Sequence, residues 1–144
     1  MEADQKRLRD QRAVVEAFLA NEDTGKYRHP AGKLGLIRAI LESGTFKAIQ
    51  TYELQYLGIV LGDAFVQEMK MEWVMVEDEY RRDPAVRMPG TTIILFPLTM
   101  ISKRIERGER VDVFDIFNWA AAKVEELQQR YAREAKSEAP PDTH

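Results

Sequence analysis

The chain has 144 residues and a mass of 16.6 kDa, the size of a single domain with one hydrophobic core. Its 44% hydrophobic and 31% charged residues are globular values, which exclude a wholly disordered chain. The formal net charge of -3 excludes a global attraction to nucleic acid or to an anionic membrane.

The absence of cysteine excludes disulfides, thiolate metal sites and a cysteine nucleophile. The N-terminal residues lack the apolar stretch of a signal peptide. No apolar run approaches the ~20 residues that a membrane span needs. We therefore expect a cytoplasmic protein with no membrane partner.

The first half of the chain predicts helices and turns. Residues Glu2 to Ala20 predict a helix whose second half is the better anchored, because its first half is charged on all sides. The turn residues in Asn21 to Gly32 predict a loop. A short amphipathic helix follows from Leu34 to Leu41, and Gly44 is suited to end it.

The stretch from Thr51 to Met69 predicts a central helix that is apolar on nearly all sides and hence buried. Gly58 and Gly62 each cost this helix ~1 kcal/mol relative to alanine. We expect them to allow the close approach of another helix or of the sheet backbone.

Two strands are predicted after the central helix, from Met71 to Asp78 and from Thr91 to Phe96. The connection between them, residues 79–90, is long for a hairpin loop. Because two strands alone are marginally stable, helices must cover both sides of the pair or a third strand must come from elsewhere in the chain or from another subunit.

The last part of the chain predicts two helices. Pro97 suits the first position of a helix that ends at Gly108. The basic edge of this helix consists of Lys103, Arg104, Arg107 and Arg110. Asp112 is the predicted N-cap of a final helix that continues to about Arg133. Its expected buried stripe is Phe114, Phe117, Ala121, Val124 and Tyr131.

These elements predict a single α+β domain over residues 1–136. It has a central buried helix, a small antiparallel sheet of two or three strands, and flanking helices. Residues 21–32 and 79–90 are its predicted loops. Residues 137–144, which contain two consecutive prolines, are predicted to be a disordered tail.

Five short segments together resemble an uncharacterised bacterial family of domains of unknown function, DUF3806. They are LGIVLGD at residues 57–63, EWV at 72–74 leading into DEY at 78–80, FP at 96–97 and RIERGE at 104–109. The resemblance covers about Leu34 to Leu127, with one departure at Arg81, where glycine is expected. It implies the fold and a bacterial origin, and the family brings no activity with it.

Asp63 is the conspicuous polar residue of the central helix, since a carboxylate on an apolar side must be paired, hydrogen-bonded or at the rim of a cleft. One hypothesis pairs Asp63 or Glu72 with Arg104 as an internal ion pair. Another places Asp63 with Tyr56 and Trp73 in a small-molecule pocket.

An acidic cluster follows the first predicted strand. Glu77, Asp78 and Glu79 could hold a divalent cation together with Asp63, because hard cations prefer carboxylate oxygens. The alternative is a solvated strand end. Their spacing matches no calcium loop and no histidine stands nearby, so we predict no metal and no cofactor.

No nucleophile has a base that the sequence can place beside it, so we expect no catalytic residues. The leading hypothesis is a non-catalytic module of the adaptor or immunity type that binds a protein partner or itself as a homo-oligomer, such as a dimer. The alternative is a small-molecule-binding domain or weak enzyme. No nucleic-acid partner is expected, because acidic residues balance the basic edge. The candidate binding residues are Asp63, Trp73, Glu77, Asp78, Glu79, Tyr80 and Arg104.

Overall fold

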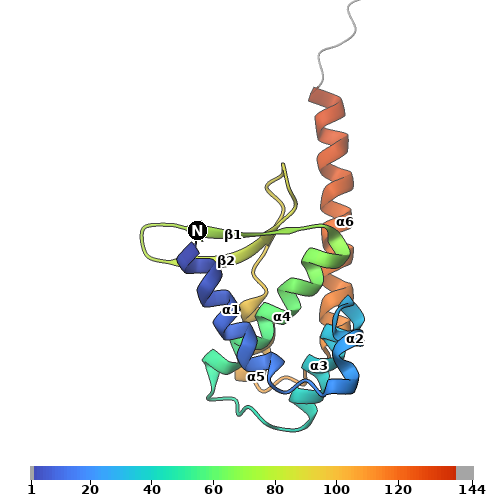
Figure 1. Cartoon of the computed structure of the whole chain (residues 1–144). Helices are drawn as coiled ribbons and strands as arrows, with labels where there is room; N and C mark the ends of the chain where they lie inside the picture. The colour runs from blue at the N-terminus through green and yellow to red at the C-terminus, as the bar shows by residue number, and fades with distance from the viewer. Residues whose placement is uncertain (1, 139–144) are drawn as a thin grey trace, which may run out of the picture.

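The structure, a computed structural model, describes residues 2–138. In chain order these residues form α1 (Glu2–Glu16), the 3-10 helix η1 (Asn21–Asp23), α2 (Thr24–Tyr27), α3 (Pro30–Glu42), α4 (Thr51–Met69), β1 (Glu72–Glu77), β2 (Arg82–Arg87), β3 (Ile94–Leu95), α5 (Leu98–Glu106) and α6 (Val113–Glu138). This arrangement of helices around a small antiparallel sheet confirms the predicted α+β class (Figure 1).

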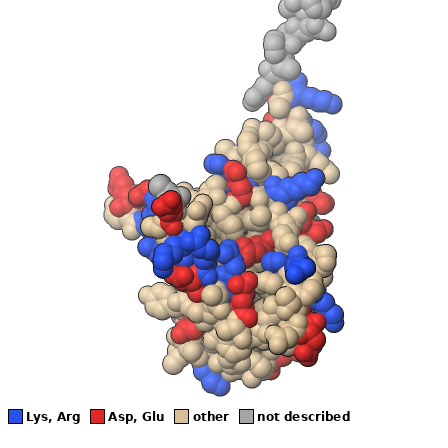
Figure 2. Space-filling model, in the orientation of Figure 1, with Lys and Arg blue, Asp and Glu red and all other residues tan. Residues whose placement is uncertain are grey.

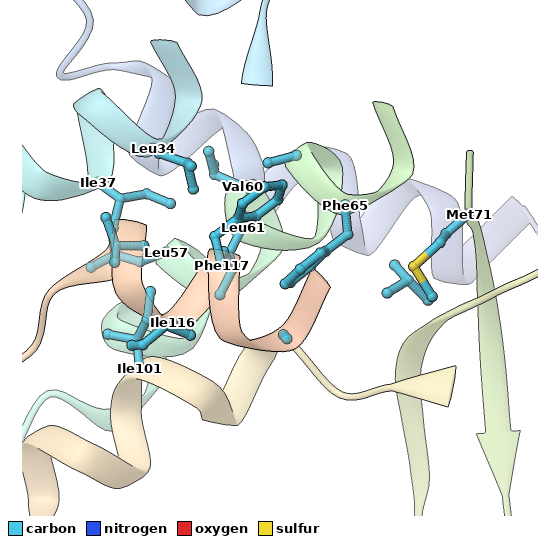
Figure 3. Close-up of a cluster of buried hydrophobic side chains, with 14 of the residues drawn as sticks. Leu34, Ile37, Leu57, Val60, Leu61, Phe65, Met71, Ile101, Ile116 and Phe117 are labelled. Carbon is cyan, nitrogen blue, oxygen red and sulfur yellow. The ribbon is translucent and has the colours of Figure 1, made fainter. Parts of the chain in front are cut away.

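Helix α4 is the central element, with α1, α3, α5, α6 and the sheet all in contact with it. Its side chains from Leu57 to Leu61 are buried, as the sequence predicts. Phe65 stacks on Phe117 of α6, with ring centroids 4.8 Å apart (Figure 3). Burying such large apolar side chains is the main stabilising contribution to the fold.

The sequence did not determine where a third strand would come from. The structure shows that it is β2, which lies within residues 79–90, the segment predicted to be a loop. The sheet order is β1-β2-β3, and the β1–β2 register runs from Glu72 opposite Arg87 to Glu77 opposite Arg82. Strand β3 has only two residues, so the predicted strand from Thr91 to Phe96 is too long.

Pro84 is the residue that hides β2 in the sequence, because proline cannot donate a ladder hydrogen bond. Strand β3 pairs only with Val86 and Arg87. On the β3 side of the sheet, β2 therefore has no neighbouring strand at Pro84. It tolerates proline there as an edge strand does.

The two glycines of α4 lie where other elements approach it closely. A Cβ atom at Gly58 would lie 2.4 Å from Leu98 Cα and 2.5 Å from the Pro97 carbonyl oxygen. A Cβ atom at Gly62 would lie 2.4 Å from the Trp73 ring. Gly58 thus allows the close approach of another helix, as the sequence predicts, whereas Gly62 makes room for the Trp73 side chain and not for the sheet backbone.

The bounds of α1 and α3 differ from the prediction. Helix α1 ends at Glu16, and α3 already begins at Pro30, which occupies a position in the first turn where a missing N–H costs nothing. The Asp112 carboxylate accepts the N–H of Phe114 at 3.0 Å, which confirms the predicted N-cap of α6.

Helix α6 continues beyond the body of the molecule (Figure 1). Its last buried side chain among the described ones is Val124, and Tyr131 is 43% exposed, so the predicted burial of Tyr131 is wrong. Of the predicted tail, Ser137 and Glu138 belong to α6, and residues 139–144 lie outside the described part of the chain.

Candidate functional site

The structure brings Asp63 and Trp73 together, as one hypothesis required, and adds Arg12 of α1. The Trp73 indole N–H donates to Asp63 Oδ1 at 3.0 Å. The Arg12 guanidinium donates to both carboxylate oxygens of Asp63, at 2.6 and 2.9 Å. The side chains of Arg12 and Asp63 are only 21% and 15% exposed. The carboxylate is therefore fully engaged by groups of its own chain.

The hypothesis that Arg104 pairs with Asp63 or Glu72 is wrong. Arg104 donates to the carbonyl of Met100, one turn earlier in α5, at 2.6 Å. Glu72 pairs instead with Arg87 on the neighbouring strand at 2.9 Å. Helix α5 begins beside α4 at Gly58, more than one turn before Asp63.

The remaining candidates lie at the turn between β1 and β2: Glu77, Asp78, Glu79 and Tyr80. The Asp78 carboxylate accepts the N–H groups of Tyr80 and Arg81, both at 2.8 Å, and these hydrogen bonds lower the pKa of Asp78. Glu77 pairs with Arg82 at 2.9 Å. Within residues 2–138, no group of three or more potential metal ligands comes together.

Further polar residues surround the Arg12–Asp63 pair. Lys33 of α3 is 7% exposed, and its ammonium group donates to the Tyr27 carbonyl at 2.8 Å. Burial lowers the pKa of Lys33. Burial raises the pKa of the Tyr27 phenol, and the Glu16 carboxylate raises it further. Cations and carboxylates offset each other here, so we interpret the cluster as structural.

A surface groove lies beside α3, between this helix and residues 18–29. We name it the α3 groove. Its volume is about 580 Å³, within the usual range of ligand sites. Apolar and small residues form most of it: Phe18, Leu19, Ala20, Ala31, Gly32, Gly35, Leu36 and Ala39. Three polar residues complete the lining: Asp23, Lys26 and His29.

Small side chains on α3 create the α3 groove. Ala31, Gly35 and Ala39 recur every four residues and therefore lie on one face of the helix. A Cβ atom at Gly35 would meet no atom within 4 Å. At Gly32, by contrast, a Cβ atom would lie 1.8 Å from the Lys26 carbonyl oxygen. The chain thus packs tightly against α3 at Gly32 and leaves open space at Gly35.

This contrast gives a matched pair of predictions on one helix. We expect Gly35→Ala to stabilise the protein by about 1 kcal/mol, because it removes a helix-interior glycine without a clash. We expect Gly32→Ala to destabilise it by about 2 kcal/mol, because the methyl group displaces the backbone near Lys26. Urea unfolding of both variants measures the difference, and equal stabilities would contradict the described packing of α2 on α3.

The α3 groove could not be predicted from the sequence, because the turn residues predict a loop at residues 21–32, where the structure has η1, α2 and the start of α3. Two signals were present in the sequence. Small residues recur at a four-residue spacing in α3, and no acidic residue occurs between Asp23 and Glu42. Neither signal indicates a groove until the residues around Phe18 are placed beside α3.

These features define a small α+β domain with a buried central helix, a three-stranded sheet and a groove on α3. Residues 33–117 match the model of a domain of unknown function, DUF3806, and the chain belongs to this family. The match confirms the resemblance seen in the sequence. The wall of the α3 groove that precedes α3 lies outside the matched residues.

The comparisons with other proteins support the fold and indicate no activity. A crystal structure of a protein from Bacteroides thetaiotaomicron VPI-5482, at 1.50 Å resolution, is similar with a TM-score of 0.66 and 16% identity. The similarity covers 83% of this chain and 44% of that one, so the chain spans less than half of its length. No curated protein matches. In residues 2–138, no helix is long and apolar enough to cross a membrane.

Proposed function

We propose that this protein is a non-catalytic interaction module that binds an apolar segment of a partner protein in the α3 groove. The observation that carries the proposal is the groove itself, which is largely apolar, measures about 580 Å³ and lies open on the surface. Apolar grooves of this kind are characteristic of binding sites.

Phe18 at the edge of the α3 groove supports a protein partner. Its side chain is 47% exposed, although it is a large aromatic residue. It packs edge to face against Phe46, with ring centroids 5.7 Å apart, so one side of the ring is already held in place. Aromatic residues, Phe among them, are enriched at protein interfaces, where they contribute large apolar contact areas.

The polar residues of the α3 groove do not form a catalytic pair. General acid–base or nucleophilic catalysis needs groups within hydrogen-bond reach of one another. Within residues 2–138, the structure contains no hydrogen bond between the side chains of Asp23, Lys26 and His29. This arrangement favours binding over catalysis.

A small-molecule-binding domain is the second candidate, and the volume of the α3 groove favours it. The groove is a better location for such a ligand than the surroundings of Asp63 and Glu77. Those two carboxylates are already paired with Arg12 and Arg82.

A variant that fills the α3 groove tests the proposal. We expect Gly35→Phe to fold normally, because its side chain enters open space, and to block the groove. Ala122→Phe, at an exposed position of α6, is the matched control of equal bulk. Both variants are first compared with the wild type by circular dichroism and thermal unfolding.

The three proteins are then used as baits in a lysate of the source organism, with quantitative mass spectrometry of the captured proteins. The proposal expects a protein that the wild type and Ala122→Phe capture and that Gly35→Phe loses at least tenfold. If no captured protein depends on the groove, the proposal is overturned. A small molecule seen in native mass spectra of the wild type and absent from Gly35→Phe would establish the second candidate instead.

A further inference from the structure

We infer that the partner segment is an amphipathic helix that carries an acidic side chain near Lys26 and His29. This inference rests on the proposed function and adds the chemistry and the orientation of the segment. It follows from the shape of the α3 groove and from the charges around it.

The shape of the α3 groove favours a helix. Its floor follows α3 from Ala31 to Ala39, with Gly35 between them, and none of these three side chains extends beyond Cβ. A second helix can approach such a face at the short end of the 8–10 Å range of interaxial distances. A partner helix would then place its apolar stripe between this floor and Phe18, which is the usual mode of helix recognition in a groove.

The charges of the segment that forms α2 and α3 favour an acidic group on the partner. The chain as a whole has a net charge of -3, yet residues 24–41 contain no aspartate or glutamate. The same segment contains four cations, Lys26, Arg28, Lys33 and Arg38. On the face seen in Figure 2, acidic and basic side chains lie next to one another.

Two of these cations are already used within the chain. Lys33 binds the Tyr27 carbonyl, and Arg38 pairs with Asp112 at 3.2 Å. Lys26 and His29 line the α3 groove and are exposed, and within residues 2–138 their side chains make no ion pair or hydrogen bond. They are therefore free to bind a carboxylate from outside.

Lys26 and His29 set the orientation of the partner helix. The Lys26 carbonyl lies against Gly32 in the first turn of α3, and His29 directly precedes α3. An acidic partner residue at this end would be attracted by the Lys26 ammonium group and would accept a hydrogen bond from the His29 imidazole. The acidic end of the partner helix should therefore lie beside the N-terminal end of α3, with its apolar stripe extending toward Ala39.

The test uses a displayed library of helical peptides, selected separately on the wild type and on Gly35→Phe. Peptides that bind only the wild type are groove-dependent. We expect these peptides to be enriched in aspartate and glutamate at one end of the apolar stripe. The affinity of one such peptide is then measured by fluorescence anisotropy against charge variants of the protein.

Lys26→Glu is expected to lower the affinity for the acidic peptide about tenfold, since it replaces attraction by repulsion at a solvent-exposed site. Changing the acidic residue of the peptide to lysine should restore most of the affinity for Lys26→Glu. His29→Gln should weaken binding less. Lys123→Glu, on the exposed side of α6, is the control and should leave the affinity unchanged.

Groove-dependent peptides without an acidic preference, or with no response to Lys26→Glu, would overturn this inference and leave the proposed function standing. A dimer of the wild type that Gly35→Phe abolishes would overturn it too, because a second copy of the chain would then occupy the α3 groove. If the selection gives no groove-dependent peptide, both this inference and the proposed function fail.

Discussion

Replacing Gly58 by alanine is expected to destabilise the protein by about 3 kcal/mol, the upper end of the usual cost of overpacking. The added methyl carbon would lie 2.4 Å from Leu98 Cα. Backbone atoms cannot rotate away as a side chain does, so α5 as a whole must move off α4. The fully buried side chain of Ile101 would then lose contacts with the core. The gain of ~1 kcal/mol in helix propensity offsets part of this cost.

Thermal unfolding is a direct measurement of this effect, and the melting temperature of Gly58→Ala should fall by about 10 °C. Gly35→Ala is the control, because it makes the same chemical change in another helix without a clash. If Gly58→Ala melted at or above the temperature of the wild type, α5 could not cross α4 as closely as the structure shows.

The central helix and its glycines could be predicted because their signals are local. A nineteen-residue apolar segment has few alternatives to burial, and paired glycines within it indicate a close neighbour. The identity of that neighbour could not be predicted. At Gly58 the neighbour is the start of α5 at Pro97 and Leu98, about forty residues away in sequence, and at Gly62 it is the Trp73 ring.

Strand β2 could not be predicted from the sequence, for a different reason. Its sequence, RDPAVR, has charged residues and a proline where a central strand usually has β-branched residues. It is a strand because β1 pairs with it along all six residues, whereas β3 pairs with only two. Tertiary pairing overrides local propensity here, and no property of the six residues alone reveals it.

The partner of Asp63 shows the same limit for the polar side chains. The sequence indicates correctly that a carboxylate on an apolar face needs a partner. The sequence contains several arginines, and no pattern in it indicates which of them pairs with Asp63. The arginine in the structure, Arg12, lies 51 residues earlier, on a helix with charges on most sides. Only the packing of α1 across α4 brings the two side chains together.

Removal of the Asp63 carboxylate should be the most damaging change to a polar side chain. Asp63→Ala leaves the guanidinium of Arg12, which is 21% exposed, without its bidentate partner and close to the buried ammonium of Lys33. It also removes the acceptor of the Trp73 N–H. Breaking one side of a buried pair costs ~3 to 5 kcal/mol, and the partial exposure places Asp63→Ala at about 3 kcal/mol.

A double-mutant cycle separates the ion pair from the other contacts of the two residues. Arg12→Met alone should cost less than Asp63→Ala, since Trp73 still donates to the carboxylate. We expect a coupling energy of about 2 kcal/mol between Arg12 and Asp63, with little change at high salt because the pair is shielded from solvent. The measurement is urea unfolding of the wild type, both single variants and the double variant.

The exposed pair of Lys6 and Asp10 on the same helix is the control, with side chains 69% and 63% exposed. Lys6→Met should change the stability by less than ~0.5 kcal/mol, because exposed i,i+4 pairs contribute little. If Arg12→Met were as mild as Lys6→Met, α1 would not be held by its ion pair to α4. The N-terminal wall of the α3 groove, which continues from α1, would then lack the anchor that Asp63 gives it.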